Sequence, residues 1–201
     1  MTIESTSAGR KRRANGEESR RRILDAAAEV AGERGYDGAS IAQVSARAGL
    51  PASSIYWHFK DKDELIAAVI ERSFEQWLRA FDTHGEDVPE LVVRIGQALV
   101  ETPDFLRLGL MLTLERRPRE ASARRVFLEV RAKTLERIAS TVREFAPDLS
   151  DDNVSLLATY AMAAVDGFFV AREIGGDSVD LAALFALHGR VLADAVTHLS
   201  A

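Results

Sequence analysis

The sequence predicts an all-α protein of about nine helices, in which three short helices precede a bundle of longer ones. Three observations support this fold class. Apolar residues recur at helical spacing along most of the chain. Capping residues, prolines and glycines separate the periodic segments, and alternating strand patterns are missing. Of the 201 residues, 47% are hydrophobic and 28% are charged, so the chain can bury a core in water.

The first predicted helices are short and are defined by their caps. The first begins at Glu17 and ends at Gly35. Its apolar face consists of Ile23, Ala27, Val30 and Ala31. Ser40 and Gln43 form a capping box at the start of the second helix, which Gly49 ends after about two turns.

Longer helices follow a third short one. Pro51 suits the first turn of that short helix. Asp61 and Glu64 form a second capping box, which starts a long helix that reaches His84. Further helical segments are expected at 88–101, 103–116, 118–145, 152–174 and 178–199. They are separated by Pro89, Pro103, Pro118, Pro147 and the Gly175-Gly176 pair.

Positive charge is concentrated at one end of the chain. Residues 1–62 hold eleven Lys and Arg against eight Asp and Glu, whereas residues 63–201 hold fifteen against twenty-three. A basic end on a protein of net charge −5 indicates contact with a polyanion. Residues 1–16 lack periodicity and are expected to form a flexible basic arm. The alternative is a solvated tail without a partner.

The composition argues against several other kinds of site. Cys is absent and the four His residues are widely separated, so we expect no disulfide, thiol catalysis or metal site. Without a nucleophile–base pair or a phosphate-binding glycine loop, we expect no enzyme, catalytic residue or cofactor. The start has no apolar h-region, and no apolar run reaches about 20 residues. We therefore expect a cytoplasmic protein without a membrane partner.

Four ringed side chains stand together at residues 56–59, and a helical wheel separates them. Ile55 and Phe59 share a face that meets the first helix, whereas Tyr56 and Trp57 point outward. Taken alone, Trp57 is better explained by packing under a neighbouring domain. However, the two short helices joined by A-G-L-P have the layout of a helix-turn-helix, whose second helix enters a DNA major groove. Together with the basic arm, this layout favours DNA binding.

The residue types around this motif suit two kinds of contact with DNA. Polar side chains on the outer face can donate to phosphates: Ser40, Tyr56, His58 and Lys62. Small side chains at the start of the second short helix can approach base edges: Ala52, Ser53 and Ser54. The exposed Trp57 completes the candidate DNA-binding surface.

The stretch G-Y-D-G-A-S-I-A-Q-V-S-A-R-A-G-L-P-A-S-S-I-Y-W-H-F-K-D-K-D-E-L closely resembles the DNA-binding signature of the tetracycline-repressor (TetR) family. The resemblance covers residues 17–70. It implies an N-terminal helix-turn-helix followed by a helical ligand-binding and dimerisation domain, with the same phosphate and base contacts. One departure is Pro51, which stands where many members have a Ser or Thr cap. Ala52 likewise lacks a hydrogen-bonding head, so direct base readout is expected to be sparse.

The last two helices are the candidate dimer interface, because they are too apolar for a half-buried surface pair. The proposed interface residues are Tyr160, Phe169, Leu184, His188, Val191, Leu192 and Ala195. The resemblance also implies a four-helix interface built from two such helices of each subunit. The alternative is that these residues belong to the core of a monomer.

An apolar cavity between the middle helices is the candidate ligand site. Its proposed lining is Trp77, Phe81, Phe105, Met111, Phe127, Asp166 and Phe168. Asp166 lies in an apolar helix, where it can orient a ligand beside Arg131 or Arg172. A simple internal salt bridge is the favoured interpretation of Asp166, and plain core is that of the aromatic residues.

These observations define an expected organisation of residues 1–16 as a basic arm, 17–62 as the helix-turn-helix domain, and 63–201 as the ligand-binding and dimerisation domain. The expected function is a ligand-responsive transcriptional repressor. It would bind a palindromic DNA operator as a homodimer and be released by a small, largely apolar effector. The alternative is a helical interaction or dimerisation module without sequence-specific DNA binding.

Overall fold

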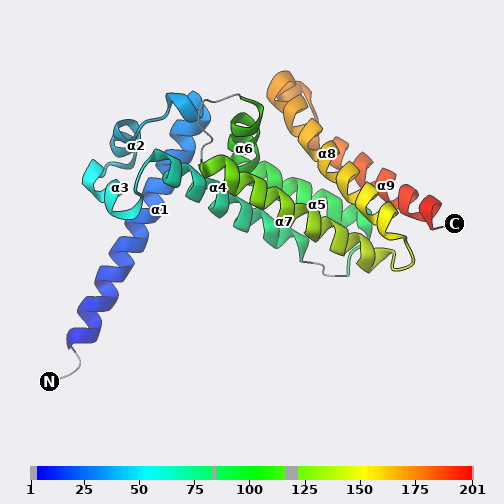
Figure 1. The fold of residues 1–201 in the computed structure, drawn as a ribbon, viewed down its shortest axis with the longest axis horizontal. Coiled ribbons are helices and arrows are strands. Elements are labelled where there is room, and N and C mark those ends of the chain that lie inside the picture. The colour runs from blue at the N-terminus through cyan, green and yellow to red at the C-terminus, as the bar shows by residue number, and fades with distance from the viewer. Residues whose placement is uncertain (1–3, 83–84, 116–121, 201) are drawn as a thin grey trace. The chain divides into compact units, whose positions relative to one another are not determined.

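The computed structural model describes residues 4–82, 85–115 and 122–200, with the backbone alone described for 4–13. Within these residues the chain forms nine α-helices, two short 3-10 segments and no strand (Figure 1). The helices are α1 (Glu4–Gly38), α2 (Ile41–Ala48), α3 (Ala52–His58), α4 (Lys62–Leu78), α5 (Val88–Glu101), α6 (Asp104–Leu114), α7 (Ser122–Phe145), α8 (Asp151–Gly175) and α9 (Leu181–Leu199). The all-α fold class predicted from the sequence is confirmed.

The main difference from the sequence analysis lies at the N-terminus. α1 extends back to Glu4, so residues 4–16 are helical where a flexible arm is predicted. The helical dihedral angles break at Gly35, with φ 71° and ψ 174°, although hydrogen bonding continues to Gly38. α4 ends at Leu78 and is followed by a 3-10 turn, Arg79–Phe81. The predicted end of this helix at His84 lies outside the described residues.

The helix-capping residues predicted from the sequence make the expected hydrogen bonds at the starts of α2 and α4. The Ser40 hydroxyl accepts from the Gln43 amide at 3.3 Å, and the Glu64 amide donates to the Asp61 carboxylate at 2.9 Å. The Glu64 carboxylate in turn accepts from the Lys60 amide at 2.7 Å. These bonds satisfy amide groups that the first helical turn leaves without partners.

The described chain forms two compact units. The first comprises 1–72 and 104–127, and the second comprises 73–103 and 128–201. α4 and α7 each contribute residues to both units. The largest fully buried side chains all belong to the first unit: Ile23, Leu24, Val30, Ile55, Leu65, Ile66, Val69, Ile70, Leu106, Leu108, Leu112 and Phe127. The helix-turn-helix therefore rests on a well-packed core.

The second unit is organised around the packing of α5 against α9. Gly189 of α9 faces Pro89, where an added Cβ would lie 2.7 Å from the Pro89 Cα. Gly96 of α5 accommodates the Phe185 ring in the same way. A further core cluster consists of Ala146, Leu149, Val154, Leu157, Ala161 and Leu192. Close approach at the two glycines lets the helices pack tightly along this contact.

One segment of the second unit is unusually apolar for its exposure. By length and composition alone, Asp151–Ser178 could cross a membrane, with a mean hydropathy of 1.7 in its most apolar window. Only 22% of that window is buried. Charged residues such as Asp166 interrupt this segment, so it contains no uninterrupted apolar run of about 20 residues.

Candidate nucleic-acid interface

The turn between α2 and α3 is held by several hydrogen bonds. Gly49 has φ 62°, in the left-handed region that favours glycine. The Leu50 amide donates to the Ser45 carbonyl at 3.2 Å, and the Ser45 hydroxyl donates to the Leu50 carbonyl at 2.6 Å. From α1, Arg22 donates to the Ala48 carbonyl at 2.6 Å. These contacts close the turn after α2 and attach the end of α2 to α1, and α3 follows in the order of a helix-turn-helix.

The ring-bearing stretch divides as the helical wheel predicts. Ile55 is 0% exposed and Phe59 is 3% exposed, whereas Tyr56 and Trp57 are 57% and 75% exposed. The guanidinium of Arg20 lies over the Phe59 ring at 5.4 Å. The outward position of two aromatic side chains on α3 is thereby confirmed. They form an exposed aromatic surface on α3.

The N-terminus of α3 is open to an approaching ligand. Pro51 is its N-cap, and no side chain caps the helix there. Ser53 is exposed, while Ala52 and Ser54 are half-buried. The small side chains therefore leave room at the start of α3 for a base edge. Their contacts with DNA stay a prediction.

Two of the residues predicted to contact phosphates, His58 and Lys62, lie at or just after the C-terminal end of α3. Burial and the positive charge of Arg20 lower the pKa of His58, so its imidazole is neutral at neutral pH. The Trp57 ring packs edge-on against it at 4.5 Å. The Lys62 ammonium donates to the Tyr36 carbonyl at 2.8 Å and lies 4.5 Å over the Tyr36 ring. The carbonyl uses one of three ammonium donors, so a phosphate contact by Lys62 remains compatible with this position.

Asp63 is a residue that the sequence analysis does not identify. It accepts hydrogen bonds from the Tyr36 hydroxyl at 3.0 Å, the Ser122 amide at 2.6 Å and the Ala123 amide at 3.1 Å. The Ser122 hydroxyl donates to it as well. Burial alone would raise the pKa of Asp63, but these hydrogen bonds outweigh it and lower the pKa. The carboxylate thus joins α1, α4 and the start of α7.

The predicted ligand residues do not gather in one described cavity. Phe105, Met111 and Phe127 belong to the first unit, and the other four belong to the second. Trp77, Phe81, Phe105 and Phe127 are at most 4% exposed. The Trp77 indole donates to the Ile95 carbonyl at 3.1 Å and packs edge-on against Phe81. The aromatic side chains are therefore core, which is the interpretation favoured from the sequence.

Asp166 is likewise part of an internal salt bridge. Its two carboxylate oxygens accept from the two terminal nitrogens of Arg131, both at 2.6 Å. Phe168 packs edge-on against Phe185. The salt bridge favoured for Asp166 from the sequence is present, and a ligand contact by this residue stays a prediction.

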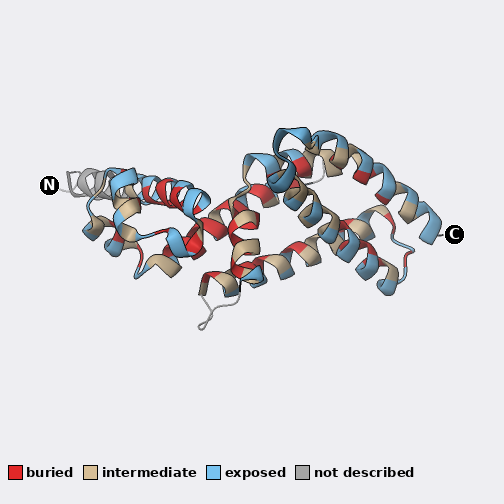
Figure 2. Cartoon of the chain, turned by 90° about the horizontal axis from the view of Figure 1, so that it is seen from above, coloured by how far each residue is buried: buried red, intermediate tan, exposed pale blue. Residues whose placement is uncertain are grey.

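The predicted dimer residues divide between surface and core. Tyr160 and Val191 are 45% and 38% exposed, while His188 and Leu192 are buried within the second unit. Phe169, Leu184 and Ala195 are intermediate. Further large apolar side chains are exposed along α8 and α9: Leu156, Val170, Ile174 and Leu187. Figure 2 shows the C-terminal helix largely in the colour of exposed residues. We call this set of exposed residues, with Tyr160 and Val191, the α8–α9 apolar surface.

Comparison with known proteins supports the same interpretation of the motif. Residues 23–69 match the family model of bacterial regulatory proteins of the tetR family. The HTH-type transcriptional regulator SrpR of Pseudomonas putida is 43% identical over 61 residues, which are 30% of this chain and 29% of SrpR. The chain matches less than half the length of the first curated relatives.

Two further proteins match this chain over most of its length, one by sequence and one by fold. The HTH-type transcriptional repressor AcnR of Corynebacterium diphtheriae is 29% identical over 169 residues, covering 81% of this chain and 85% of AcnR. A crystal structure of the transcriptional regulator FadR from Bacillus subtilis, in complex with stearoyl-CoA, superposes with a TM-score of 0.69. The two sequences are 19% identical, and the superposition covers 85% of this chain and 96% of the FadR chain. The two proteins therefore share the fold.

Proposed function

Because this chain belongs to the TetR family of bacterial regulatory proteins, we propose that it is a transcriptional repressor that binds a palindromic operator as a homodimer. We further propose that a small effector releases it from DNA. The observation that carries the proposal is the exposed Tyr56-Trp57 pair on α3, above the buried Ile55 and Phe59. An exposed aromatic pair on a recognition helix can pack against a DNA backbone while the tyrosine hydroxyl donates to a phosphate.

In this proposal the first unit supplies the contacts with DNA. The Tyr56 hydroxyl and the His58 ring donate to phosphates, and Lys62 adds a positive charge from the first turn of α4. Ala52, Ser53 and Ser54 approach the base edges. None of these side chains makes a bidentate contact with a base, so DNA shape contributes to sequence selection.

The α8–α9 apolar surface supports the homodimer. Side chains such as Leu156, 60% exposed, and Ile174, 83% exposed, lie on helices whose other residues are packed into the second unit. Water contact with so many apolar side chains is unfavourable, and a symmetric partner can bury them. A dimer also supplies two recognition helices, which a palindromic operator requires. Burial by a partner subunit would also explain why Asp151–Ser178 is so apolar, and no lipid bilayer is needed to explain it.

Selection of binding sites from random duplex DNA at near-physiological salt tests the proposal. We expect an enriched palindrome whose half-sites lie about one helical turn apart. Affinity for it should fall steeply with salt, because phosphate contacts release counterions. A folded, dimeric protein that enriches no sequence would instead support the interaction-module alternative.

A further inference from the structure

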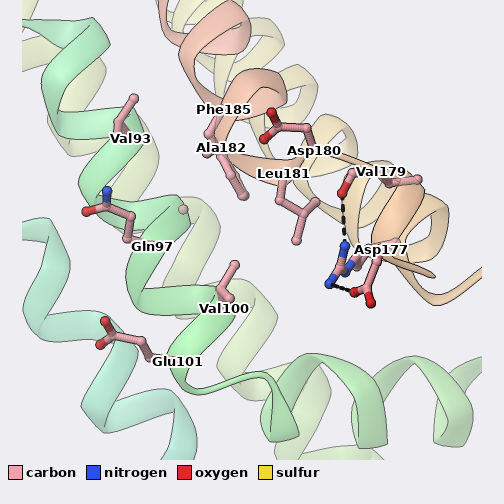
Figure 3. A pocket seen from close by; sticks show the side chains of 12 residues that line it. Val93, Gln97, Val100, Glu101, Asp177, Val179, Asp180, Leu181, Ala182 and Phe185 are labelled. Atoms are coloured by element: carbon pink, nitrogen blue, oxygen red, sulfur yellow. Dashed lines mark hydrogen bonds and ion pairs between the residues drawn. The ribbon is translucent and has the colours of Figure 1, made fainter. Parts of the chain in front are cut away.

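A groove of about 620 Å³ lies in the second unit between α5 and the junction of α8 with α9 (Figure 3). Its volume is in the range of small-molecule sites. In Figure 3, Val93, Gln97 and Val100 follow α5 on one side, and Leu181, Ala182 and Phe185 belong to α9 on the other. The seven residues proposed from the sequence as the lining of a ligand site lie outside this groove, whereas Arg172, considered there as a partner of Asp166, lines it.

The floor of the groove is apolar and firmly packed. Phe185 is 3% exposed, and its ring packs edge-on against Phe168 at 5.6 Å. An added Cβ on Gly96 would lie 2.3 Å from the Phe185 ring, so glycine is what admits the ring here. At the rim, Val100 is 54% exposed. A ligand with apolar groups would cover Val100 and rest on Phe185.

The charges around the groove are unbalanced. Arg172 is the one basic residue among those lining it, and its guanidinium is occupied locally. It donates to the Asp177 carboxylate at 2.6 Å and to the Gly176 and Val179 carbonyls at 2.8 and 3.1 Å. Arg172 therefore neutralises Asp177 and the C-terminal end of α8.

Two carboxylates remain without a cationic partner among the described residues. Asp180 caps α9 by accepting from the Ala183 amide at 3.0 Å through one oxygen. Glu101, at the end of α5, makes no ion pair within the described part of the chain. The groove thus combines an apolar floor with a net negative rim, which attracts cations and repels anions. The described residues contain no cluster of His, Cys, Asp and Glu that could hold a metal ion.

We propose that this groove binds an amphipathic organic cation, with its apolar groups on Phe185 and Val100 and its positive charge near Glu101 and Asp180. Resting on the proposed function, we infer in addition that such a cation is the effector. A ligand between α5 and the first turn of α9 would bias the position of α9, which carries part of the α8–α9 apolar surface. Ligand binding and dimer geometry would then be linked.

Calorimetric titration of the full chain with tetraphenylphosphonium tests the site, with tetraphenylborate as an anion of the same shape. We expect the cation to bind, and the anion to bind at least about tenfold more weakly. Val100→Lys should weaken cation binding about tenfold, since it fills the rim and adds a like charge. Glu101→Gln should weaken it about threefold at low salt. Leu128→Lys and Glu136→Gln, both on α7 and outside the groove, are matched controls and should leave binding unchanged.

The outcomes separate the site from the proposed function. Equal binding of the two ions, or cation binding that Val100→Lys leaves unchanged, would overturn the groove proposal. Failure of the cation to bind a protein that still selects an operator would overturn it too, while leaving the regulator intact. Release of wild-type protein from its operator by the cation, with Val100→Lys retained on DNA, would support the effector assignment. Groove binding without release would refute that assignment alone.

Discussion

Asp63 accepts a hydrogen bond from the amide of Ser122 at 2.6 Å, which joins the first turn of α4 to the first turn of α7 across 59 residues of sequence. The Ser122 hydroxyl and the Ala123 amide donate to the same carboxylate. Asp63 therefore acts as an N-terminal cap for α7, although it lies on another helix. The Tyr36 hydroxyl adds α1 to this contact, so one side chain connects three helices of the first unit.

We expect Asp63→Ala to destabilise the protein by about 1–3 kcal/mol, because it leaves several half-buried donors without their charged acceptor. Urea unfolding, followed by circular dichroism at neutral pH, measures this loss. Asp148→Ala, at an exposed aspartate in the loop before α8, is the control and should change little. Equal stability of the two variants would show that the Asp63 contacts contribute nothing net.

Tyr56→Phe should weaken binding to operator DNA and to unrelated DNA by the same factor, about fivefold, since only a phosphate hydrogen bond is lost. Competition binding against both DNA types at one salt concentration provides the two affinities. Thr113→Val also removes one hydroxyl, on α6 and outside the proposed DNA and dimer surfaces, and should leave both affinities unchanged. A loss confined to the operator would indicate that Tyr56 contacts a base.

Leu156→Lys should weaken the proposed dimer by about tenfold or more, because it places a charge in an apolar surface that the partner covers. Sedimentation velocity over a concentration series reports the monomer–dimer equilibrium. Leu114→Lys changes a leucine that is even more exposed but belongs to the first unit, and it should not affect association. If both variants associate like the wild type, the α8–α9 apolar surface is not the interface.

Because His188 is buried, we expect the protein to lose stability in mild acid. It is 3% exposed, its Nε2 has no partner among the described residues, and burial lowers its pKa below the ordinary value of 6.5. The unfolded chain therefore binds a proton more readily than the folded one. Stability is fully present above pH 6.5 and falls as the pH drops below 6.5 towards the lowered folded-state pKa.

Urea unfolding at pH 8 and at pH 5.5 measures this effect. His188→Phe keeps a ring beside Tyr160 and Phe168 but cannot titrate, so its stability should differ less between the two pH values than that of the wild type. The comparison cancels the contribution of His58, whose pKa is also lowered. An identical pH dependence in wild type and variant would assign the effect to other groups.

The sequence predicts the helix-turn-helix well because its determinants are local. The Ser40 and Asp61 caps, Gly49 and the division of Ile55 from Tyr56 depend on spacing within a few residues. The Asp63 contact could not be predicted in this way, since nothing local indicates that residue 63 meets residue 122. The motif K-D-K-D-E-L marks the position only as acidic and near the start of a helix.

The aromatic residues and the N-terminus show two further limits of prediction from apolar periodicity. Apolar periodicity identifies Phe105 and Trp77 as inward-facing, but it does not say which neighbour each one meets, and the two belong to different units. Periodicity also detects only helices that bury one face. A stretch such as residues 4–16, without an apolar stripe, therefore goes unrecognised although α1 includes it.

The paired charges of Arg131 and Asp166 link α7 to α8 within the second unit. Both side chains are about three-quarters buried, with exposures of 25% and 23%, and the pair is bidentate at 2.6 Å. We expect Asp166→Leu to cost about 1–3 kcal/mol, because it removes the carboxylate that pairs with the partly buried Arg131 guanidinium. Replacing both residues, as Arg131→Met with Asp166→Leu, should restore most of the lost stability. A complete double-mutant cycle by urea unfolding isolates the pair. Additive losses in the cycle would mean that the two charges do not stabilise each other despite their geometry.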